Sequence, residues 1–588
     1  MADNPLQSNK PGKKELSMEQ RLLLAFVLMG LVLFLTPYFY KAPPPPPKTT
    51  APAKSQTAPA SSAAVSKTAE PAAPTPAAPA ASAEPVPGQI VGTSEQQFVV
   101  DTDIYRVTLS NRGGTVRSWI LKKYRDKQGK PLELINEASY SKVAPPFSVV
   151  LRDDKAAEAL NYGLYVAKPA ANGLGIEYEF SDGRNYAKKT FQFANSGGAH
   201  AFLSQIETEV TINGMPADHM IQWRGGFGDA TVLNRTAEQH VVYFDPHEAA
   251  MLGFSQGKLT NKDAKSVKDG PVITTGDYSF AGLDDRFFAA VFLPKDNTQI
   301  KVEAVKDDVP PAPAGKEEMR VGVELGGDSV NHFTLFVGPK DIDLLRRVDP
   351  KLQQMIDWGW YGVIAKPLFL AMHWMNDNIV HNYGWSIVLI TIVINIVVLP
   401  LRLKSMKSQR KMQSLQPKLA AINAKYKGLS MRDPKKAEQN QEVMAFYKKE
   451  GVNPMGGCLP MVIQLPLIYA FYKVLAVTIE MRGAHWMWIS DLSQPEQLPI
   501  HILPLIMIVS QFVMQKMTPN PGMDPSQAKM MMFMPLMFGF LFYNFSSGLV
   551  LYWLTSNLVG IAQQWAVNRM MPAPAQSPPP VALKKKGK

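Results

Sequence analysis

Long apolar runs and short alternating segments divide this chain into an anchor, a strand-rich region and a helical region. Residues 22–40 carry no charge and are long enough to cross a bilayer as a helix. From about 97 to 339, alternating segments such as residues 205–212 are separated by turn signals, among them Gly113-Gly114. Such a pattern is typical of an antiparallel, sandwich-like all-β domain, which we place at residues 89–340. The chain then becomes apolar and helical, which predicts a polytopic α-helical membrane protein.

Five further spans are predicted within a core at residues 383–567, giving six in all. They lie at 383–401, 457–479, 498–515, 530–545 and 548–567. Residues 341–382 precede them. There an apolar stripe at helical spacing predicts either a helix lying in the membrane interface or an ordinary core helix. The stripe consists of Leu368, Met372, Met375 and Ile379.

Residues 402–455 separate the second and third spans and predict an antiparallel helical hairpin. Apolar residues recur at spacings of 3, 4, 3 and 4 in its first arm, and three more can face them from the second arm. The first set is Met412, Leu415, Leu419, Ile422 and Tyr426, and the second is Val443, Phe446 and Tyr447.

The N-terminal run has two interpretations, an uncleaved anchor or a cleaved signal peptide. It is longer than a usual signal core, and no small-x-small site directly follows it, so we expect an anchor. Residues 1–21 would then be cytoplasmic. Residues 41–88 are rich in Pro and Ala, cannot bury a core, and predict an extended spacer.

The distribution of charge orients these parts. The net charge is +12, and residues 402–455 carry 13 Lys and Arg against four acids. The tail at 568–588 is also basic, whereas residues 480–497 contain one Arg. The positive-inside rule places the hairpin, the tail and both termini in the cytoplasm, and the β domain in the periplasm of a bacterial inner membrane. Because topology explains the cations, we expect no DNA partner.

Motifs for catalysis or cofactor binding are missing from the sequence. Cys458 is the one cysteine, no Cys/His cluster has zinc-ligand spacing, and no P-loop or GxGxxG occurs. We therefore expect no catalytic residue, no metal and no cofactor. A secondary transporter or channel is the alternative class, but it predicts repeats and intramembrane acids, and the predicted spans contain no Asp or Glu.

Several strongly polar residues lie inside predicted spans. Thr391 and Asn395 are four residues apart and share a helix face, and Gln464 lies in the third span. Tyr552 and Trp553 lie in the last span. Such residues mark a functional site or make ordinary hydrogen bonds between helices, and composition alone leaves both alternatives open.

The order of the parts and a series of local motifs resemble the YidC family of membrane protein insertases. The motifs include Tyr383-Gly-Trp-Ser386, Leu415-Gln-Pro-Lys418, Gly451-Val-Asn-Pro-Met-Gly-Gly-Cys458 and Ser547-Gly-Leu-Val-Leu-Tyr-Trp553, and they cover about 358 to 570. Gly113-Gly114 and Arg286-Phe-Phe288 match more loosely. The presence of the outer domain resembles the Gram-negative branch.

This resemblance implies a non-enzymatic insertase and chaperone. Its core helices would form a polar groove that is open to the cytoplasm and to lipid and closed to the periplasm. A nascent hydrophobic segment would enter the groove and move into the bilayer, with or without the Sec translocon. The implied partners are nascent membrane proteins, the Sec translocon, the ribosome and anionic lipids. Family position assigns Thr391, Asn395, Gln464, Tyr552 and Trp553 to the groove.

One residue departs from the family pattern. Where better-known members carry an arginine, this chain has Asn395, which is polar but uncharged. Two other cations are candidates to replace that arginine. Arg402 follows seven residues later near the same face, and Lys473 lies inside the third span. Lys473 alternatively extends its amine to the membrane interface.

Overall fold

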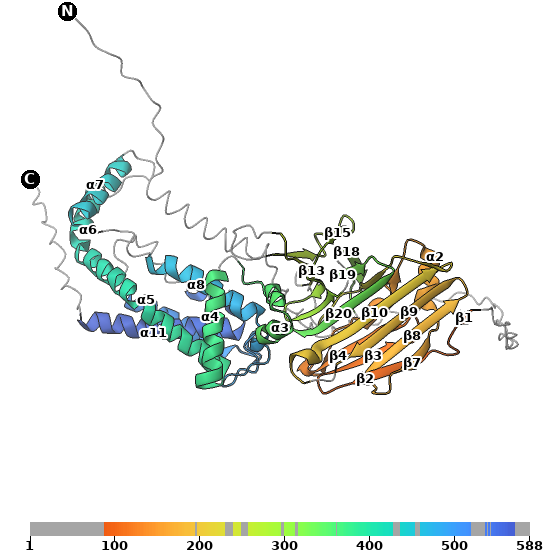
Figure 1. Ribbon diagram of the computed structural model, residues 1–588. Coiled ribbons are helices and arrows are strands. Elements are labelled where there is room, and N and C mark those ends of the chain that lie inside the picture. The colour runs from red at the N-terminus through yellow and green to blue at the C-terminus, as the bar shows by residue number, and fades with distance from the viewer. Residues whose placement is uncertain are drawn as a thin grey trace, which may run out of the picture. The chain divides into compact units, whose positions relative to one another are not determined.

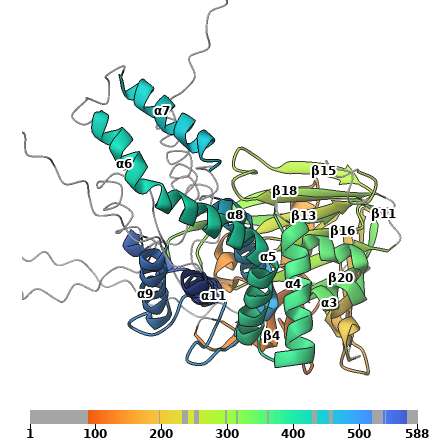
Figure 2. The same ribbon diagram turned by 90° about the vertical axis from the view of Figure 1, so that its left-hand side faces the viewer.

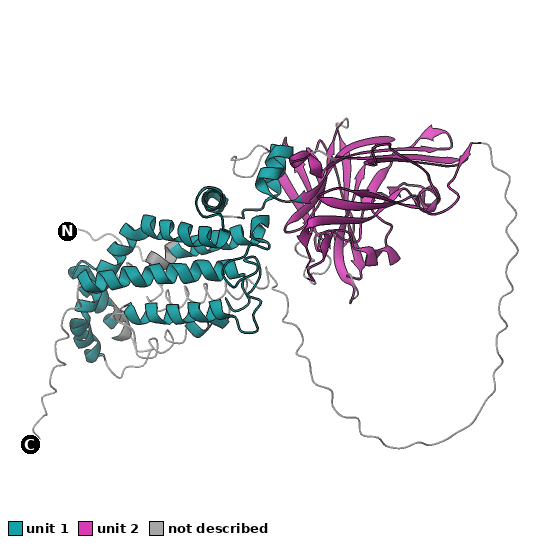
Figure 3. Cartoon of the chain, turned by 90° about the horizontal axis from the view of Figure 1, so that it is seen from below, with its two compact units in different colours: residues 1–32, 339–588 teal, residues 33–338 magenta. Residues whose placement is uncertain are grey.

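The computed structural model describes residues 88–570, and the chain divides into two compact units (Figure 3). One unit is Leu33–Gly338 and the other is Pro339–Lys588 together with Met1–Val32. We call their described parts the β unit and the helical unit. The predicted N-terminus, anchor, almost all of the spacer and most of the basic tail lie outside the described residues. So do the gaps at 127, 195–196, 230–238, 249–256, 296–298, 312–314, 360–361, 427–434, 453–458, 519–534, 538 and 541.

Three antiparallel sheets make up the β unit (Figure 1). The largest has the order β1-β8-β9-β10-β20-β17-β16-β13-β14, with β7 on β8 and β11 on β10. Its strands are β1 (Gln89–Ile90), β7 (Val166–Pro169), β8 (Gly175–Asp182), β9 (Asn185–Phe193), β10 (Leu203–Ile212), β11 (Met215–Pro216), β13 (His240–Asp245), β14 (Lys258–Asp263), β16 (Phe280–Asp284), β17 (Phe288–Pro294) and β20 (Val330–Pro339).

The two smaller sheets have the orders β15-β18-β19-β12-β6 and β2-β3-β4-β5. The first contains β6 (Val149–Val150), β12 (Met220–Trp223), β15 (Val272–Gly276), β18 (Ile300–Val309) and β19 (Glu318–Gly326). The second contains β2 (Gln97–Asp101), β3 (Tyr105–Ser110), β4 (Thr115–Arg125) and β5 (Pro131–Glu133). The predicted β domain is thus confirmed, although it also contains one short helix, α2 (Asp154–Tyr162).

Aromatic side chains hold the three sheets together. The ring of Trp119 on β4 lies 5.8 Å from Phe193 on β9 and 6.3 Å from Trp223 on β12, centroid to centroid. The alternation along β10 is as the sequence predicts, since Ile206 and Val210 are buried while Gln205 on the same strand is exposed. Aromatic rings bury large areas, so these contacts stabilise the packing of the sheets.

A lysine without a carboxylate partner lies inside this core. Lys189 on β9 is fully buried, and its Nζ donates to the carbonyl oxygens of Gly113 at 2.6 Å and Phe147 at 2.7 Å. The ammonium also lies 5.6 Å from the centroid of the Tyr165 ring. Burial lowers the pKa of Lys189 to about 7, because the charged form loses its water.

The Gly113-Gly114 pair makes room for this lysine. Both residues have positive φ, 70° and 54°. A Cβ on Gly113 would lie 2.3 Å from the carbonyl oxygen of Asn161, and one on Gly114 would lie 3.3 Å from Cδ of Lys189. The turn signal in the sequence therefore marks a close approach of backbone and side chain as well as a left-handed turn.

The helical unit contains one described helix whose length and hydropathy suit a membrane crossing, α5 (Tyr383–Ser414). Gln464–Val477 and Ile502–Met517 are shorter apolar helices. The unit comprises α3 (Ile342–Val348), α4 (Gly362–Met375), α5, α6 (Gln416–Lys425), α7 (Lys435–Lys449), α8 (Leu459–Val477), α9 (Ile502–Met517) and α11 (Ser547–Met570). Of the span predicted at 530–545, residues 530–534, 538 and 541 lie outside the described residues.

Helix α5 extends well beyond the span predicted at 383–401. It continues through Pro400 to Ser414, although the residues after 401 are rich in cations. Hydropathy locates the edge of the apolar region, whereas a helix ends where its backbone hydrogen bonds end, so the two boundaries need not coincide.

The predicted stripe at 368–379 is confirmed at Leu368 and Met372 and wrong at Ile379, while Met375 is half-buried. Leu368 and Met372 are buried together with Ala365 and Phe369, on the side of α4 that contacts α5 and α8. Ile379 is 52% exposed, because residues 376–380 form a π-helical turn that rotates it away from this face. The opposite face of α4 exposes Val363, Leu370 and Trp374, three more apolar side chains.

The predicted helical hairpin forms from α6 and α7, which run side by side (Figure 2). Six of the eight predicted apolar residues form its core, whereas Ile422 and Tyr426 are only half-buried and lie outside it. Leu415 and Leu419 are buried with Tyr447 and Val452, and Met412, Val443 and Phe446 pack against them. Ion pairs of Lys418 with Glu450 and of Lys425 with Glu442 link the arms, and exposed pairs of this kind add little stability.

Candidate functional site

A polar cluster joins α5, α8 and α11 of the helical unit. The guanidinium of Arg402 on α5 donates to Oε1 of Gln563 on α11 at 3.1 Å and to Oε1 of Gln464 on α8 at 3.3 Å. The Nε2 of Gln464 then donates to the hydroxyl of Tyr552 on α11 at 2.7 Å. We call Arg402, Gln464, Tyr552 and Gln563 the Arg402 cluster.

Packing fixes the orientation of this cluster. The Tyr552 ring is buried and stacks on Phe471 of α8, with the centroids 4.0 Å apart. Gly560 on α11 leaves space beside the guanidinium, since a Cβ there would lie 3.7 Å from NH1 of Arg402 and 2.8 Å from Cε of Met514. The cluster is therefore built from helices whose apolar surroundings hold each polar group in place.

The partners of Arg402 accept hydrogen bonds from it without cancelling its charge. Both hydrogen bonds go to neutral amides, and the described part of the chain offers this guanidinium no ion pair. A cation held by neutral groups in a medium of low dielectric keeps a strong positive field around it. The arrangement can therefore attract carboxylates and carbonyl oxygens.

Thr391 and Asn395 are buried on the predicted face of α5, but their side chains bond to their own helix. The hydroxyl of Thr391 donates to the Ile387 carbonyl at 2.6 Å, and Nδ2 of Asn395 donates to the Thr391 carbonyl at 2.7 Å. Gln563 donates to the backbone carbonyl of Asn395 at 3.4 Å. Asn395 thus meets the cluster through its backbone rather than through its amide.

Trp553 faces a different neighbour from Tyr552, as adjacent residues on a helix do. Its ring packs on Phe542 with a centroid distance of 4.5 Å, and its indole N–H donates to Oε1 of Gln511 on α9 at 3.4 Å. The groove residues expected from the sequence therefore divide between the α5–α8–α11 junction and the α9–α11 contact.

Of the two candidate cations, Arg402 lies in the cluster and Lys473 does not. Lys473 is almost completely buried, and its Nζ lies 2.8 Å from Oδ2 of Asp357. Burial works against ionisation of Asp357, but the hydrogen bond and charge of Lys473 lower its pKa below the usual value. Lys473 thus fastens α8 to the segment before α4, where its amine pairs with a carboxylate whose side chain is 61% exposed.

The loop between α8 and α9 covers the N-terminal ends of α5 and α11. The backbone amides of Gly548 and Ser547 donate to the carbonyls of Leu492 and Gln494, at 2.9 and 2.8 Å. At α5, Nδ2 of Asn382 donates to the His485 carbonyl at 3.0 Å. This is the end of the helices that the charge pattern assigns to the periplasm.

Gly384 is the point at which this loop meets α5 most closely. A Cβ on Gly384 would lie 2.3 Å from Cγ of Trp486, whose ring is buried. We expect Gly384→Ala to displace the ring and loosen the loop, because such overpacking costs about 1–3 kcal/mol. In the full chain, peptides covering 482–497 should then exchange amide hydrogens about tenfold faster or more.

Ser386→Ala is the matched control for this experiment. It lies on the same helix and removes only a hydroxyl that bonds to the Asn382 carbonyl, so the loop should keep its protection. Equal exchange in the two variants would show that the Gly384 contact does not hold the loop.

Gln563 is the functional candidate that the sequence reasoning missed. It bridges Arg402 and the Asn395 carbonyl, 161 and 168 residues away along the chain. The sequence also does not predict the hydrogen bond from Nδ2 of Asn557 on α11 to the Ser510 hydroxyl on α9, at 3.0 Å. The signal for Gln563 was present, since the Gln563-Gln564 pair places two strongly polar side chains inside the predicted last span.

Comparison with known proteins covers both units. The family described as "60Kd inner membrane protein" matches residues 374–574, and the one described as "YidC periplasmic domain" matches residues 97–371. A membrane protein insertase YidC of Polynucleobacter asymbioticus is 34% identical over 491 residues, covering 81% of this chain and 85% of that protein. One from Geotalea daltonii is 31% identical over 577 residues, covering 95% and 100%.

A solved structure is also similar. It is described as "Active YidC insertase crystal structure with the first transmembrane domain resolved". The match covers 81% of this chain and 93% of that one, at 19% identity and a TM-score of 0.34.

Proposed function

The chain belongs to the YidC family of membrane protein insertases, and from that membership we propose that its helical unit receives nascent hydrophobic segments at the Arg402 cluster and releases them into the bilayer. The observation that carries this proposal is an arginine held by neutral amides among three apolar helices. Such a group is costly to maintain in a membrane protein unless it serves a function.

The physical task of an insertase is to lower the cost of moving a polar flank through hydrocarbon. Backbone and side-chain polar groups that lose water without a partner cost several kcal/mol each. Amide, hydroxyl and guanidinium groups in the cluster offer such partners part of the way across. Burial of the client's apolar helix in lipid then drives release, so the step needs no covalent chemistry and no nucleotide hydrolysis.

Arg402 takes the electrostatic role in this proposal. Its field attracts acidic or carbonyl-rich flanks of a client, and Gln464, Gln563 and Tyr552 position it. Arg402 lies seven residues beyond Asn395, or roughly 10 Å of helix rise toward the hairpin. A client flank would therefore meet the positive charge sooner after leaving the cytoplasm than it would with an arginine at 395.

The orientation follows from the charge pattern. The hairpin and both termini lie in the cytoplasm, the β unit lies in the periplasm, and the loop at 482–497 closes the outer end of the site. Helix α4 lies in the outer interface, with Val363, Leu370 and Trp374 toward lipid. The exposed lysines of the hairpin region, such as Lys404, Lys407 and Lys411, would contact anionic lipid or the ribosome. The Sec translocon is a further partner in some insertions.

Site-specific photocrosslinking tests the proposal. A photoreactive residue replaces Thr391, Asn395, Gln464 or Trp553 in turn, and a ribosome-stalled nascent membrane protein serves as client. The structure supplies controls on the same helices, since Val397 on α5 is 71% exposed and Leu558 on α11 is 53% exposed. We expect crosslinks at Gln464 and Asn395 that exceed those at the controls.

Two results would contradict the proposal. Equal crosslinking at Val397 and Leu558 would mean that clients slide along the lipid-facing surface instead. Client insertion that did not depend on the protein at all would favour the transporter or channel alternative. Crosslinking at Trp553 decides whether the α9–α11 contact also receives clients.

A further inference from the structure

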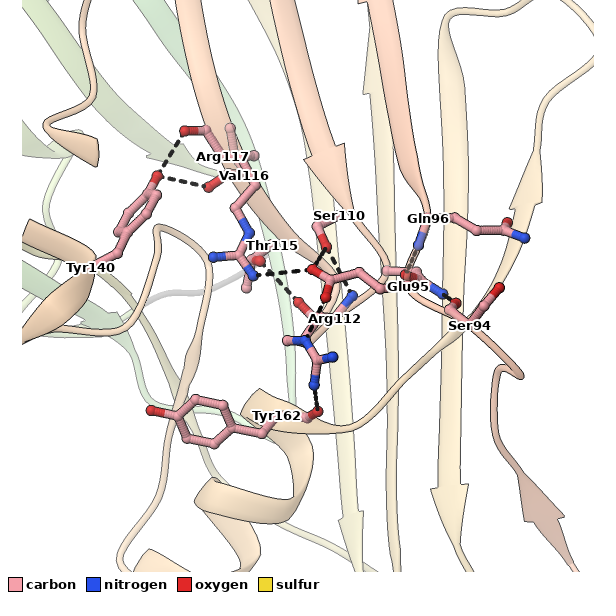
Figure 4. A network of polar contacts seen from close by, with 11 residues as sticks. Ser94, Glu95, Gln96, Ser110, Arg112, Thr115, Val116, Arg117, Tyr140 and Tyr162 are labelled. Atoms are coloured by element: carbon pink, nitrogen blue, oxygen red, sulfur yellow. Dashed lines mark hydrogen bonds and ion pairs between the residues drawn. The ribbon is translucent and has the colours of Figure 1, made fainter. Parts of the chain in front are cut away.

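A short strap crosses the surface of the β unit between β1 and β2 (Figure 4). We define it as residues 91–96. The Gly92 amide donates to the Leu164 carbonyl at 2.7 Å. Asn111, just after β3, donates through Nδ2 to the Ser94 carbonyl at 2.9 Å and accepts from the Gln96 amide at 2.7 Å. The strap is therefore fixed at both ends, and Glu95 projects from it.

Two arginines converge on the carboxylate of Glu95 (Figure 4). Nε of Arg112 donates to Oε2 at 2.9 Å, and NH2 of Arg117 lies 3.9 Å from Oε1. The hydroxyl of Ser110 also donates to Oε1, at 3.2 Å. The Arg112 hydrogen bond is the main cause that lowers the pKa of Glu95, so this carboxylate stays ionised.

Each guanidinium is held from a second side. Arg117 lies over the ring of Tyr140, 5.5 Å from its centroid, and the Tyr140 hydroxyl donates to the Arg117 carbonyl at 2.8 Å. NH1 of Arg112 donates to the carbonyl of Tyr162 at 3.3 Å. Such contacts hold the two guanidinium groups in position for a ligand at low entropic cost.

Within the contact itself, positive charge exceeds negative charge. Two guanidinium groups share one carboxylate, and all three side chains remain partly exposed, at 39% for Arg112, 23% for Arg117 and 41% for Glu95. The side chain of Tyr162 next to them is 59% exposed. Paired arginines beside an exposed tyrosine are suited to carboxylate groups on a peptide, because a guanidinium fork matches carboxylate geometry.

We propose that Arg112 and Arg117 form a docking site for an acidic peptide segment of a periplasmic partner protein, and that Glu95 occupies this site as an internal competitor. Because Glu95 belongs to the same chain, its effective concentration at the site is high. A single free carboxylate cannot displace it, whereas a segment with several acids that also covers Tyr162 can. The proposal is independent of client insertion by the helical unit.

The test measures binding of an acidic peptide to the full chain in nanodiscs of zwitterionic lipid. The probe is a fluorescent eight-residue peptide of alternating Glu and Gly, followed by anisotropy, and a Gln-Gly peptide is its uncharged counterpart. Glu95→Gln removes the competitor but keeps both arginines. We expect it to bind the acidic peptide about tenfold more tightly than the wild type, because a charge-assisted competitor is gone.

The arginine variants complete the design. The double substitution Arg112→Gln and Arg117→Gln should abolish binding to the site. Arg152→Gln and Arg184→Gln remove the same charge from exposed positions of the same unit and should change affinity less than twofold. This control separates the site from the general attraction of a chain with net charge +12.

Three outcomes would overturn the proposal. One is that Glu95→Gln binds no more tightly than the wild type. Another is that the control pair loses as much affinity as the Arg112/Arg117 pair. The last is that Glu95→Gln also binds the Gln-Gly peptide about tenfold more tightly, which would reflect a loosened strap rather than carboxylate recognition. Because Glu95→Gln retains the arginines, its result stands even if the double variant folds poorly.

Discussion

Replacing Arg402 with glutamine should reduce client insertion about tenfold or more while the helical unit stays folded. Glutamine keeps the aliphatic stem and a neutral polar group at this position, so we expect the three helices to stay packed. What disappears is the uncompensated charge. Hydrogen bonds to a charged group contribute about 1.5–3 kcal/mol, which corresponds to about ten- to a hundredfold. The measurement is the protease-protected fraction of a client synthesised in the presence of proteoliposomes.

Two controls separate this charge from its neighbours. Lys404→Gln removes an exposed cation two residues further along α5 and should leave insertion unchanged. Adding Asn395→Arg to Arg402→Gln returns a cation to the same helix face two turns away, and we expect it to restore insertion in part. Wild-type insertion by Arg402→Gln alone would remove Arg402 from the mechanism.

The β unit should become more stable as the pH rises from 7 to 10. Burial lowers the pKa of Lys189 to about 7 from its usual 10.5, and in the unfolded chain this depression is lost. Below pH 7 both states are protonated, so the lysine adds no pH dependence. Between the two values the unfolded chain binds more protons than the folded one, so the free energy of unfolding increases with pH. The gain is about 4 kcal/mol at 1.36 kcal/mol per pH unit.

Thiol labelling in urea measures this dependence within the full chain. Cys458 is the one cysteine, so Cys458→Ser combined with Val107→Cys places a single buried thiol in β3. The reagent pulse is set to label unfolded chains completely at each pH. Lys189→Met is the matched variant, and its stability should lack the rise between pH 7 and 10. A rise of the same size in both proteins would assign the dependence to other groups.

Local patterns were sufficient for the architecture. The strand at β10 and the helices of the hairpin were predicted from which side of each element is apolar. Tertiary contacts did not change these assignments. The stripe at 368–379 failed only at Ile379, where a π-helical turn changes the period. Hydropathy located α5 because a long apolar run has few possible structures other than a membrane-spanning or buried helix. It gave the end of the apolar region, however, and not the end of the helix.

The membership of the polar cluster was beyond the reach of local patterns. Gln464 and Tyr552 are 88 residues apart, and Arg402 and Gln563 are 161 apart. Whether such pairs meet depends on the rotation of each helix about its own axis. Trp553 directly follows Tyr552 on α11, yet its side chain points toward a different neighbour. Lys473 likewise found Asp357 at a separation of 116 residues.

The sequence by itself thus determined the order of the β-rich and helical parts and the polar residues available for a site, and its charge pattern predicts an orientation across the membrane. Period, hydropathy and charge distribution encode these features along the chain. The tertiary structure decided which of those residues share a hydrogen-bond network, which cation carries an uncompensated charge, and that Lys189 and Glu95 lie where they do. Those properties arise from packing between distant segments, where burial and partners set the energy of each polar group.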